Sequence, residues 1–304
     1  MRSKPDTTTA NSFAIGGEVV VSRLGYGAGN VLGQTWWEQP SQRRELLLTL
    51  RRLPEIGVTL IDSGRMYASG ISDTLIRVTL HPYDGLFLAT KAALQYTMRH
   101  SGRPLDVREY LLQQARKGLG TLGIERHGLW QLHHVNPAIP YDELLSAVLS
   151  LKEEGIIYYA GLIEPTIAQI EQARTLFPVA TVQSVYNVAD RRNEELLNYC
   201  ERHGIGFIAS LPLAGGYLAR GGALLNRIAT NHDATPAQIA LAWLLKRSPV
   251  ILAIPGAAKV RHVDENIGAV NVCLSEDEFA ELDRAGKQMQ PGSREGLFNN
   301  ESRY

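Results

Sequence analysis

Short apolar runs alternate with longer amphipathic stretches along most of the chain. Eight runs, each bounded by turn residues, have the length and composition of buried strands. They cover residues 24–28, 58–61, 86–90, 129–132, 158–163, 181–186, 206–210 and 250–254. Hydrophobic residues spaced three and four positions apart predict helices between them, over 42–55, 106–120, 141–155, 192–204 and 236–247.

The predicted helices carry recognisable end signals. Asp106 stands at an N-cap position, and Thr235 precedes Pro236 at the first helical position of another helix. Gly155 and Gly204 close two further helices, as glycine does where the chain turns left-handed after a helix. These signals fix where the helical segments begin and end.

Strands and helices that alternate eight times predict parallel strands joined by right-handed crossovers. Eight such units close into a (β/α)8 TIM barrel of the α/β class, and an open doubly wound sheet is the competing layout. Residues 12–15 and 19–21 flank Gly16-Gly17 and predict an N-terminal β-hairpin. The polar segment 288–304 is expected to be a C-terminal loop over one barrel end. We expect residues 1–304 to form one domain.

Composition and charge restrict the class of ligand. Hydrophobic residues make up 44% of the chain and charged residues 20%, which is the balance of a globular protein with a sizeable core. Because 31 basic residues balance 31 acidic ones, neither nucleic acid nor a membrane surface is an expected partner, and a small molecule fits better. Cys200 and Cys273 have no metal-binding spacing, so no metal is expected. The polar first ten residues favour the cytoplasm. The oligomeric state stays open.

A glycine-rich loop suggests a dinucleotide fingerprint but does not match it. Gly25, Gly27 and Gly29 lack the glycine required at the sixth place of the motif, which is Asn30. The acidic residue that should close a second strand falls in a leucine-rich helix instead. We interpret the loop as a tight turn that follows the first strand and can approach a ligand.

Polar residues at the ends of successive predicted strands carry the candidate chemistry. Asp62, Lys91 and His133 stand at such ends, and Tyr67 lies in the loop after Asp62. These residue types suit carbonyl reduction, which needs a hydride on carbon and a proton on oxygen. The tyrosine pKa of ~10 is too high for an effective acid unless the anion is stabilised. An ammonium such as Lys91 would lower that pKa, Asp62 would hold the ammonium, and His133 would orient the carbonyl.

Each of these residues has an ordinary alternative. Asp62 could cap the next turn, Tyr67 could be a surface aromatic, and Lys91 could be a solvated charge. His133 is one of eight histidines. Their placement at successive strand ends favours a shared site.

Several motifs in order resemble the aldo-keto reductases. Residues 61–73 are similar to the D-[TS]-x-x-x-Y-G-x-G-x-S-E signature, and residues 88–91 to the strand with the catalytic lysine. Residues 129–134 resemble L-Y-Q-L-H, residues 182–187 resemble V-Q-x-x-Y-N, and residues 254–266 resemble the stretch that binds the adenosine phosphate. The resemblance covers about residues 13–282 and implies the barrel, NADP(H), carbonyl reduction and catalytic roles for Asp62, Tyr67, Lys91 and His133. Segments 212–216 and 242–249 look most like pyridoxal-reductase-like members.

The resemblance also implies the residues that bind the cofactor. They are Gln183, Pro212, Leu213, Gly256, Lys259, Arg261, His262, Glu265 and Asn266. Lys259, Arg261 and His262 cluster where a helix is predicted to begin, and cations at a helix N-terminus favour a phosphate. NADP is therefore preferred to NAD. Trp36, Met66 and Tyr96 lie in loops at the expected barrel mouth and are candidates for substrate contact.

Two departures from the family pattern fall in the expected nicotinamide pocket. Ile163 and Glu164 replace the usual Ser and Asn, and Ser210 replaces an aromatic residue that would stack on the ring. Either Gln183 and backbone groups compensate, or cofactor binding is weakened and the chemistry differs. Two alternatives therefore stay open: non-redox acid–base chemistry such as dehydration or isomerisation, and a regulatory subunit that binds nucleotide.

Overall fold

The structure is a computed structural model that describes most of the chain. It describes residues 11–29, 40–64, 70–93, 99–100, 103–104, 106–133 and 139–288. Tyr67, Trp36, Met66 and Tyr96, four of the predicted site residues, lie outside these ranges. The predicted C-terminal loop also lies outside them, except for Gln288.

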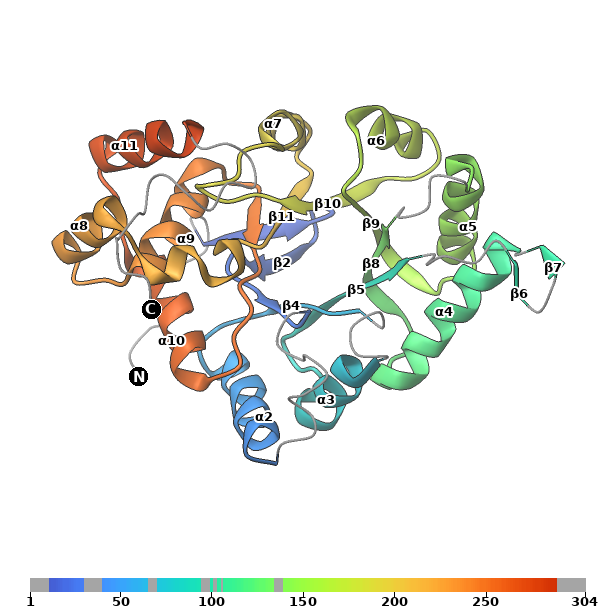
Figure 1. Ribbon diagram of the computed structural model, residues 1–304. Coiled ribbons are helices and arrows are strands. Elements are labelled where there is room, and N and C mark those ends of the chain that lie inside the picture. Colours follow the sequence, from blue (N-terminus) through green and yellow to red (C-terminus); the bar gives the residue numbers. More distant parts are fainter. Residues whose placement is uncertain are drawn as a thin grey trace.

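Eight parallel strands form the centre of the molecule (Figure 1). Their order in the sheet is β12-β11-β10-β9-β8-β5-β4-β3, so strands that follow one another in the central sheet are neighbours. The sheet closes between its first and last strands, where Leu24 forms a parallel bridge with Ala253. The strands are β3 (Tyr26–Gly27), β4 (Leu60–Asp62), β5 (Phe87–Ala93), β8 (His127–His133), β9 (Ile157–Ile163), β10 (Val179–Val185), β11 (Gly206–Ser210) and β12 (Ile251–Ala253). The predicted (β/α)8 barrel is confirmed.

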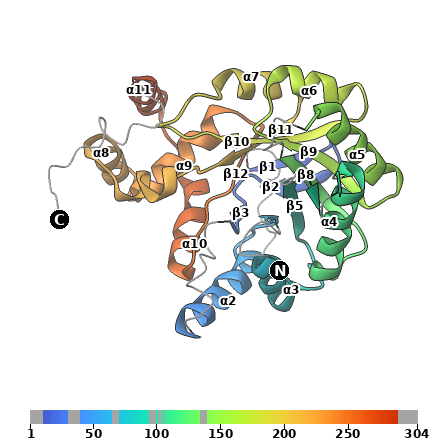
Figure 2. The same cartoon turned by 45° about the vertical axis from the view of Figure 1, so that its right-hand side comes forward.

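Helices surround the strands, as the turned view also shows (Figures 1 and 2). In the described part of the chain they are α2 (Pro40–Glu55), α3 (Ile71–Leu80), α4 (Val107–Leu122), α5 (Tyr141–Glu153), α6 (Ile167–Arg174), α7 (Glu194–His203), α8 (Ala223–Asn231), α9 (Pro236–Arg247), α10 (Val260–Gly268) and α11 (Glu276–Lys287). The predicted caps are present, since the Asp106 side chain accepts from the Glu109 N–H and Thr235 forms a capping box with Gln238. Short 3-10 turns, η2 (Ala214–Gly216) and η3 (Leu218–Arg220), follow β11, and η4 (Ala269–Asn271) follows α10.

The predicted hairpin packs against the barrel interior. Strands β1 (Ser12–Ile15) and β2 (Val19–Ser22) pair antiparallel around Gly16 and Gly17, both of which have positive φ. Ile15 is fully buried and belongs to a cluster formed with inward-facing residues of seven barrel strands. These residues are Leu60, Ala89, Leu129, Tyr159, Ala180, Ile208 and Leu252. A second short ladder, β6 (Arg99–His100) with β7 (Arg103–Pro104), was not predicted.

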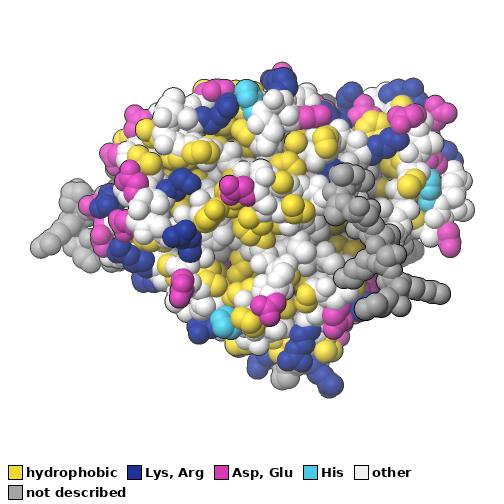
Figure 3. Space-filling model, turned by 180° about the vertical axis from the view of Figure 1, so that it is seen from behind, with side chains coloured by type: hydrophobic (Ala, Val, Ile, Leu, Met, Phe, Trp, Pro, Cys, Tyr) yellow, Lys and Arg dark blue, Asp and Glu magenta, His cyan; other side chains and the backbone are white. Residues whose placement is uncertain are grey.

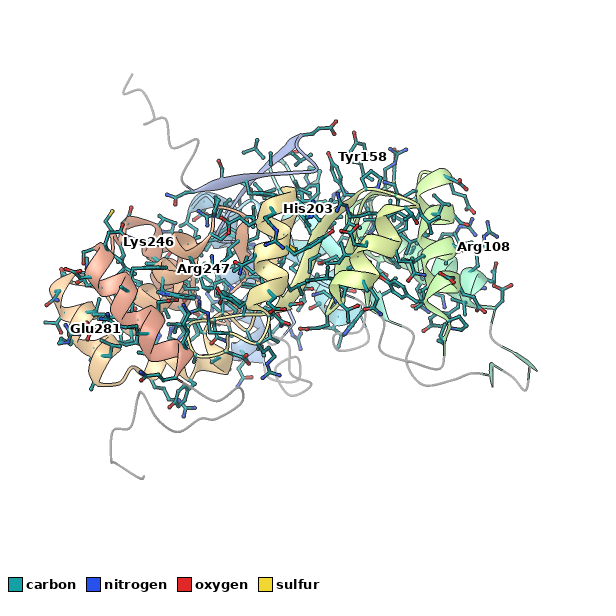
Figure 4. All side chains as sticks on the ribbon, turned by 90° about the horizontal axis from the view of Figure 1, so that it is seen from above. Arg108, Tyr158, His203, Lys246, Arg247 and Glu281 are labelled. Carbon is teal, nitrogen blue, oxygen red and sulfur yellow. The ribbon has the colours of Figure 1, made fainter. Side chains whose placement is uncertain are left out.

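An ionic network ties three outer helices together. Glu194, at the start of α7, accepts from Arg247 Nε at 2.9 Å and from the Tyr186 hydroxyl at 2.6 Å. Arg191 also donates to Glu194, at 2.8 Å, and reaches Asp283 of α11 at 2.9 Å. Arg247, the last residue of α9, is labelled in Figure 4. The network fixes α7, α9 and α11 around the loop that follows β10.

The described surface agrees with the balanced charge of the chain. On the face drawn in Figure 3, basic and acidic side chains are interspersed, with hydrophobic side chains between them. Within the described ranges, none of the helices combines the length and the apolar character that crossing a membrane requires.

Candidate active site

A buried ion pair lies at the carboxyl ends of two neighbouring strands. The Lys91 Nζ of β5 is 2.5 Å from the Asp62 Oδ2 of β4, and the two side chains are only 3% and 2% exposed. β4 and β5 pair in parallel, so the predicted strand-end positions meet on one side of the barrel. A carboxylate and an ammonium buried together each offset part of the cost of burying the other charge.

Two glutamine side chains complete the surroundings of the Asp62 carboxylate. The Gln131 Nε2 donates to Asp62 Oδ1 at 2.9 Å, and the Gln183 Nε2 donates to Oδ2 at 3.3 Å. Gln183 Oε1 in turn accepts from Lys91 Nζ at 3.2 Å. Gln131 was not predicted as a site residue, because a polar residue inside a strand is not marked by spacing alone. These contacts fix Asp62 and Lys91 in one orientation.

His133 lies on the same side of its strand as Gln131. Residues two apart on a strand point to the same face, and the Gln131 side chain points into the barrel toward Asp62. His133 ends β8 and is partly exposed, two residues closer to the carboxyl end. The structure therefore brings three of the four predicted catalytic residues to one end of the barrel interior.

The described residues before and after the segment that contains Tyr67 are hydrogen-bonded to their neighbours. On one side, the Ser63 Oγ donates to Asp73 Oδ1 at 2.6 Å, and the Ser63 N–H donates to the Ala89 carbonyl at 2.8 Å. On the other side, the Ser72 hydroxyl donates to the Ala28 carbonyl at 3.3 Å. Tyr67 itself lies outside the described residues, so its role stays a prediction.

A cavity of about 440 Å³ opens beside the ion pair. Asp62 and Gln183 form its floor. The first barrel strand, β3, the loop after β11 and the residues after β12 form its walls. The wall residues are Gly27, Gly29, Ser210, Leu211, Pro212, Leu213, Gly215, Gly216, Ile254, Pro255 and Gly256. The lining of this cavity therefore includes four predicted cofactor residues, Gln183, Pro212, Leu213 and Gly256.

The loop after β11 forms one wall of this cavity. In the loop after β11, Leu211, Ala214, Gly215 and Gly216 all have positive φ. The Ala214 and Gly216 N–H groups donate to the Leu211 and Leu213 carbonyls, both at 2.9 Å, and these bonds keep the turn compact. Gly27 is required at the opposite wall, since a Cβ there would lie 2.6 Å from the Ile254 carbonyl oxygen. A side-chain amide at one end and glycine-rich walls that a ligand can approach closely fit a nicotinamide dinucleotide.

A second cavity, of about 510 Å³, lies between the beginnings of α2 and α10. The predicted phosphate ligands Lys259 and Arg261 line it together with Ser41, Gln42 and Glu45. His262 is exposed and its Nδ1 lies 3.4 Å from Glu265 Oε2, whereas Asn266 is buried. Glu45 was not predicted, because it lies on a helix 215 residues away from Val260, its hydrogen-bond partner.

The departures from the family pattern are structurally distinct from one another. Ser210 lines the first cavity, while Ile163 and Glu164 are not among its lining residues. Glu164 has a positive φ, and its Oε1 accepts from the Val185 N–H at 2.9 Å. One carboxylate oxygen is therefore already engaged with the neighbouring strand end rather than with the cavity.

Comparisons with known proteins agree with this geometry. A family model described as "Aldo/keto reductase family" matches residues 23–287, and the chain therefore belongs to the aldo/keto reductase family. An uncharacterized oxidoreductase of Schizosaccharomyces pombe is 40% identical over 285 residues, which cover 94% of this chain and 93% of the relative. Pyridoxine 4-dehydrogenase of Escherichia coli is 30% identical and is covered over 100% of its length, with 92% of this chain.

Solved structures share the fold over nearly the whole chain. An aldo/keto reductase from Klebsiella pneumoniae, in complex with NADP and acetate, superposes with a TM-score of 0.77 at 27% identity. The match covers 95% of this chain and 99% of that one. The predicted family and enzyme class are confirmed.

Proposed function

We propose that the chain is an NADPH-dependent carbonyl reductase that converts an aldehyde or ketone to an alcohol. The buried Lys91–Asp62 pair carries the proposal, because its Asp62 lines a cavity together with the predicted cofactor residues Gln183, Pro212, Leu213 and Gly256. The NADP-bound relative from Klebsiella pneumoniae supports the choice of cofactor. Lys259 and Arg261 in the second cavity support NADPH over NADH, since a 2′-phosphate favours cations.

Each residue has a separate task in the proposed reaction. Bound NADPH supplies the hydride to the carbonyl carbon. Tyr67 donates the proton to the carbonyl oxygen, and Lys91, held by Asp62, stabilises the phenolate that remains. His133 donates a hydrogen bond that orients the carbonyl oxygen. Gln183 and Ser210 hold the carboxamide end of the cofactor, and the loop of residues 211–216 lies along its phosphates.

The similarity to one relative suggests a substrate class to test. Pyridoxine 4-dehydrogenase covers nearly the whole chain at 30% identity. We therefore propose an aldehyde on a small ring as the first class to test. Trp36, Met66 and Tyr96 are the proposed contacts, on the basis of their loops in the sequence.

The test is a titration of the protein with NADPH and NADH, followed by consumption of NADPH with a panel of aldehydes that includes pyridoxal. Saturable binding that favours NADPH, with turnover, supports the proposal. Product formation in the absence of nucleotide would favour dehydration or isomerisation instead. The replacement of the expected Ser by Ile163, which cannot hydrogen-bond a carboxamide, is the observation behind that alternative.

Tyr67→Phe separates the proton donor from the binding residues. We expect the NADPH Kd to change by less than about threefold, while kcat falls by roughly 10²–10⁴, the usual contribution of general acid catalysis. Stopped-flow single turnovers and a binding titration on the same preparation measure both quantities. Undiminished turnover in this variant would mean that another group donates the proton.

A further inference from the structure

A carboxylate shares the second cavity with two cations. Glu45 of α2 lines this cavity together with Lys259 and Arg261. Glu45 is half-buried, whereas both cations are exposed. A site with this composition attracts a phosphate through the cations and repels it through the carboxylate.

The Glu45 side chain also forms a hydrogen bond with the beginning of α10. Helix α10 begins at Val260, and its N-cap residue Lys259 makes no side-chain capping bond. Instead, the Glu45 Oε1 accepts from the Val260 N–H at 3.3 Å. The first N–H groups of a helix are a preferred site for a phosphate. Glu45 thus engages a donor that an anionic ligand in this cavity would otherwise use.

We propose that Glu45 sets the discrimination between NADPH and NADH by holding a negative charge against the 2′ position of the adenosine ribose. The inference rests on the proposed function, because it requires a nicotinamide dinucleotide in the two cavities. A 2′-phosphate carries about −1.5 to −2 charges at neutral pH and is repelled by a nearby carboxylate. The 2′-hydroxyl of NADH can instead donate a hydrogen bond to that carboxylate.

The preference for NADPH is then the difference between two opposing effects. Lys259 and Arg261 favour the phosphate, and Glu45 disfavours it. We therefore expect the natural chain to bind both nucleotides, with a preference for NADPH that is smaller than the two cations alone would produce.

Glu45→Gln tests the charge without removing the cap. Glutamine keeps an oxygen that accepts from the Val260 N–H, but it carries no charge. We expect NADPH to bind about tenfold more tightly and NADH to change by less than about twofold. Lys259→Ala should shift the ratio in the opposite direction. Nicotinamide fluorescence measures the dinucleotides, and calorimetry with adenosine 2′,5′-bisphosphate and AMP measures the adenosine end alone.

Glu55→Gln is the matched control. Glu55 lies on the same helix about 15 Å further along the axis, is not among the cavity-lining residues, and pairs with Arg52 at 3.0 Å. In the Glu55→Gln variant, the ratio of the NADPH Kd to the NADH Kd should equal the ratio in the natural chain. An unchanged ratio in Glu45→Gln, or an equal loss of both nucleotides, would overturn the role of Glu45 and leave the proposed function standing. If the natural chain binds neither nucleotide, both fail together.

Discussion

Asp62 and Lys91 bury opposite charges in the barrel, where neither charge would be stable alone. Their position depends on a residue with no side chain. A Cβ at Gly64 would lie 2.5 Å from the Lys91 Cγ, close to the root of the lysine side chain. Because this part of the side chain cannot swing away without moving the Nζ, Gly64 is what allows Lys91 to reach Asp62.

Gly64→Ala should therefore displace the ammonium from the carboxylate. We expect kcat to fall at least about tenfold, because an ion pair shifted by about 1 Å no longer stabilises the developing charge. The NADPH Kd should change much less. Single-turnover rates and NADPH titrations of the purified variant measure the two effects.

Gly120→Ala provides the comparison for this variant. Gly120 lies inside α4, and a Cβ there would meet nothing within 4 Å. This substitution should leave kcat unchanged and stabilise the protein by roughly 0.5–1 kcal/mol, as alanine does in a helix. Equal kcat values in the two variants would show that Lys91 tolerates the added methyl group.

The loop after β11 forms the wall of the first cavity where we propose that the phosphates lie. A side chain from the loop after β10 holds it in place. Leu211 has a φ of 48°, which is unfavourable for a residue with a Cβ. The Asn187 Nδ2 donates to the Leu211 carbonyl at 2.9 Å, and Asn187 is only 1% exposed. Its Oδ1 accepts from the N–H groups of Ala189 and Asp190, both at 2.9 Å. One side chain thus fixes two loops at the cavity.

Asn187→Asp should loosen this loop while keeping the turn, because a carboxylate still accepts from the two N–H groups but cannot donate to Leu211. We expect NADPH binding to weaken roughly fivefold or more, which corresponds to about 1 kcal/mol for a lost hydrogen bond. Asn193→Asp removes a similar bond, from Nδ2 to the Val185 carbonyl at 3.0 Å, in which the loop after β11 takes no part. If both variants bind NADPH equally, Asn187 does not position the loop.

The elements that could be predicted from the sequence are those with strong local signals. Thr235-Pro236 marks the beginning of α9, and Gly16-Gly17 marks the hairpin. Helix α6 was not predicted, because it has eight residues and buries only Ile170 and Ala173. A helix with so short an apolar stripe shows no clear period.

The same distinction applies to the residues of the candidate site, since only those with a local signal in the sequence could be predicted. Asp62 and Lys91 could be predicted because each directly follows a predicted strand, and parallel strands bring their ends together. Gln131 and Glu45 could not, because their roles depend on contacts between residues far apart in the chain: 69 positions for Gln131 with Asp62 and 215 for Glu45 with Val260. Such contacts follow from the packing of the barrel and leave no local pattern.

At the scale of the whole molecule, the barrel is closed by a seam with few hydrogen bonds between strands. The Gly25 N–H donates to the Ala253 carbonyl at 2.9 Å, and the Ala253 N–H donates to the Arg23 carbonyl at 2.8 Å. The Arg23 side chain reinforces the seam, since it donates to the carbonyls of Ile251 at 3.1 Å, Leu245 at 2.8 Å and Ser248. Burial lowers the pKa of Arg23 to about 10, so it remains protonated at neutral pH.

Arg23→Met should weaken the closure of the barrel, because methionine keeps much of the apolar stem but leaves buried carbonyl groups without these donors. Each buried acceptor left without a partner costs about 1–3 kcal/mol, and Arg23 donates to three, so we expect the free energy of unfolding to fall by at least about 3 kcal/mol. Urea unfolding followed by circular dichroism measures the change. Arg192→Met, which removes a half-exposed arginine paired with Asp190, should cost less than about 1 kcal/mol. Similar losses in the two variants would mean that the seam does not depend on Arg23, and that packing of the hairpin and helices alone keeps the first and last strands together.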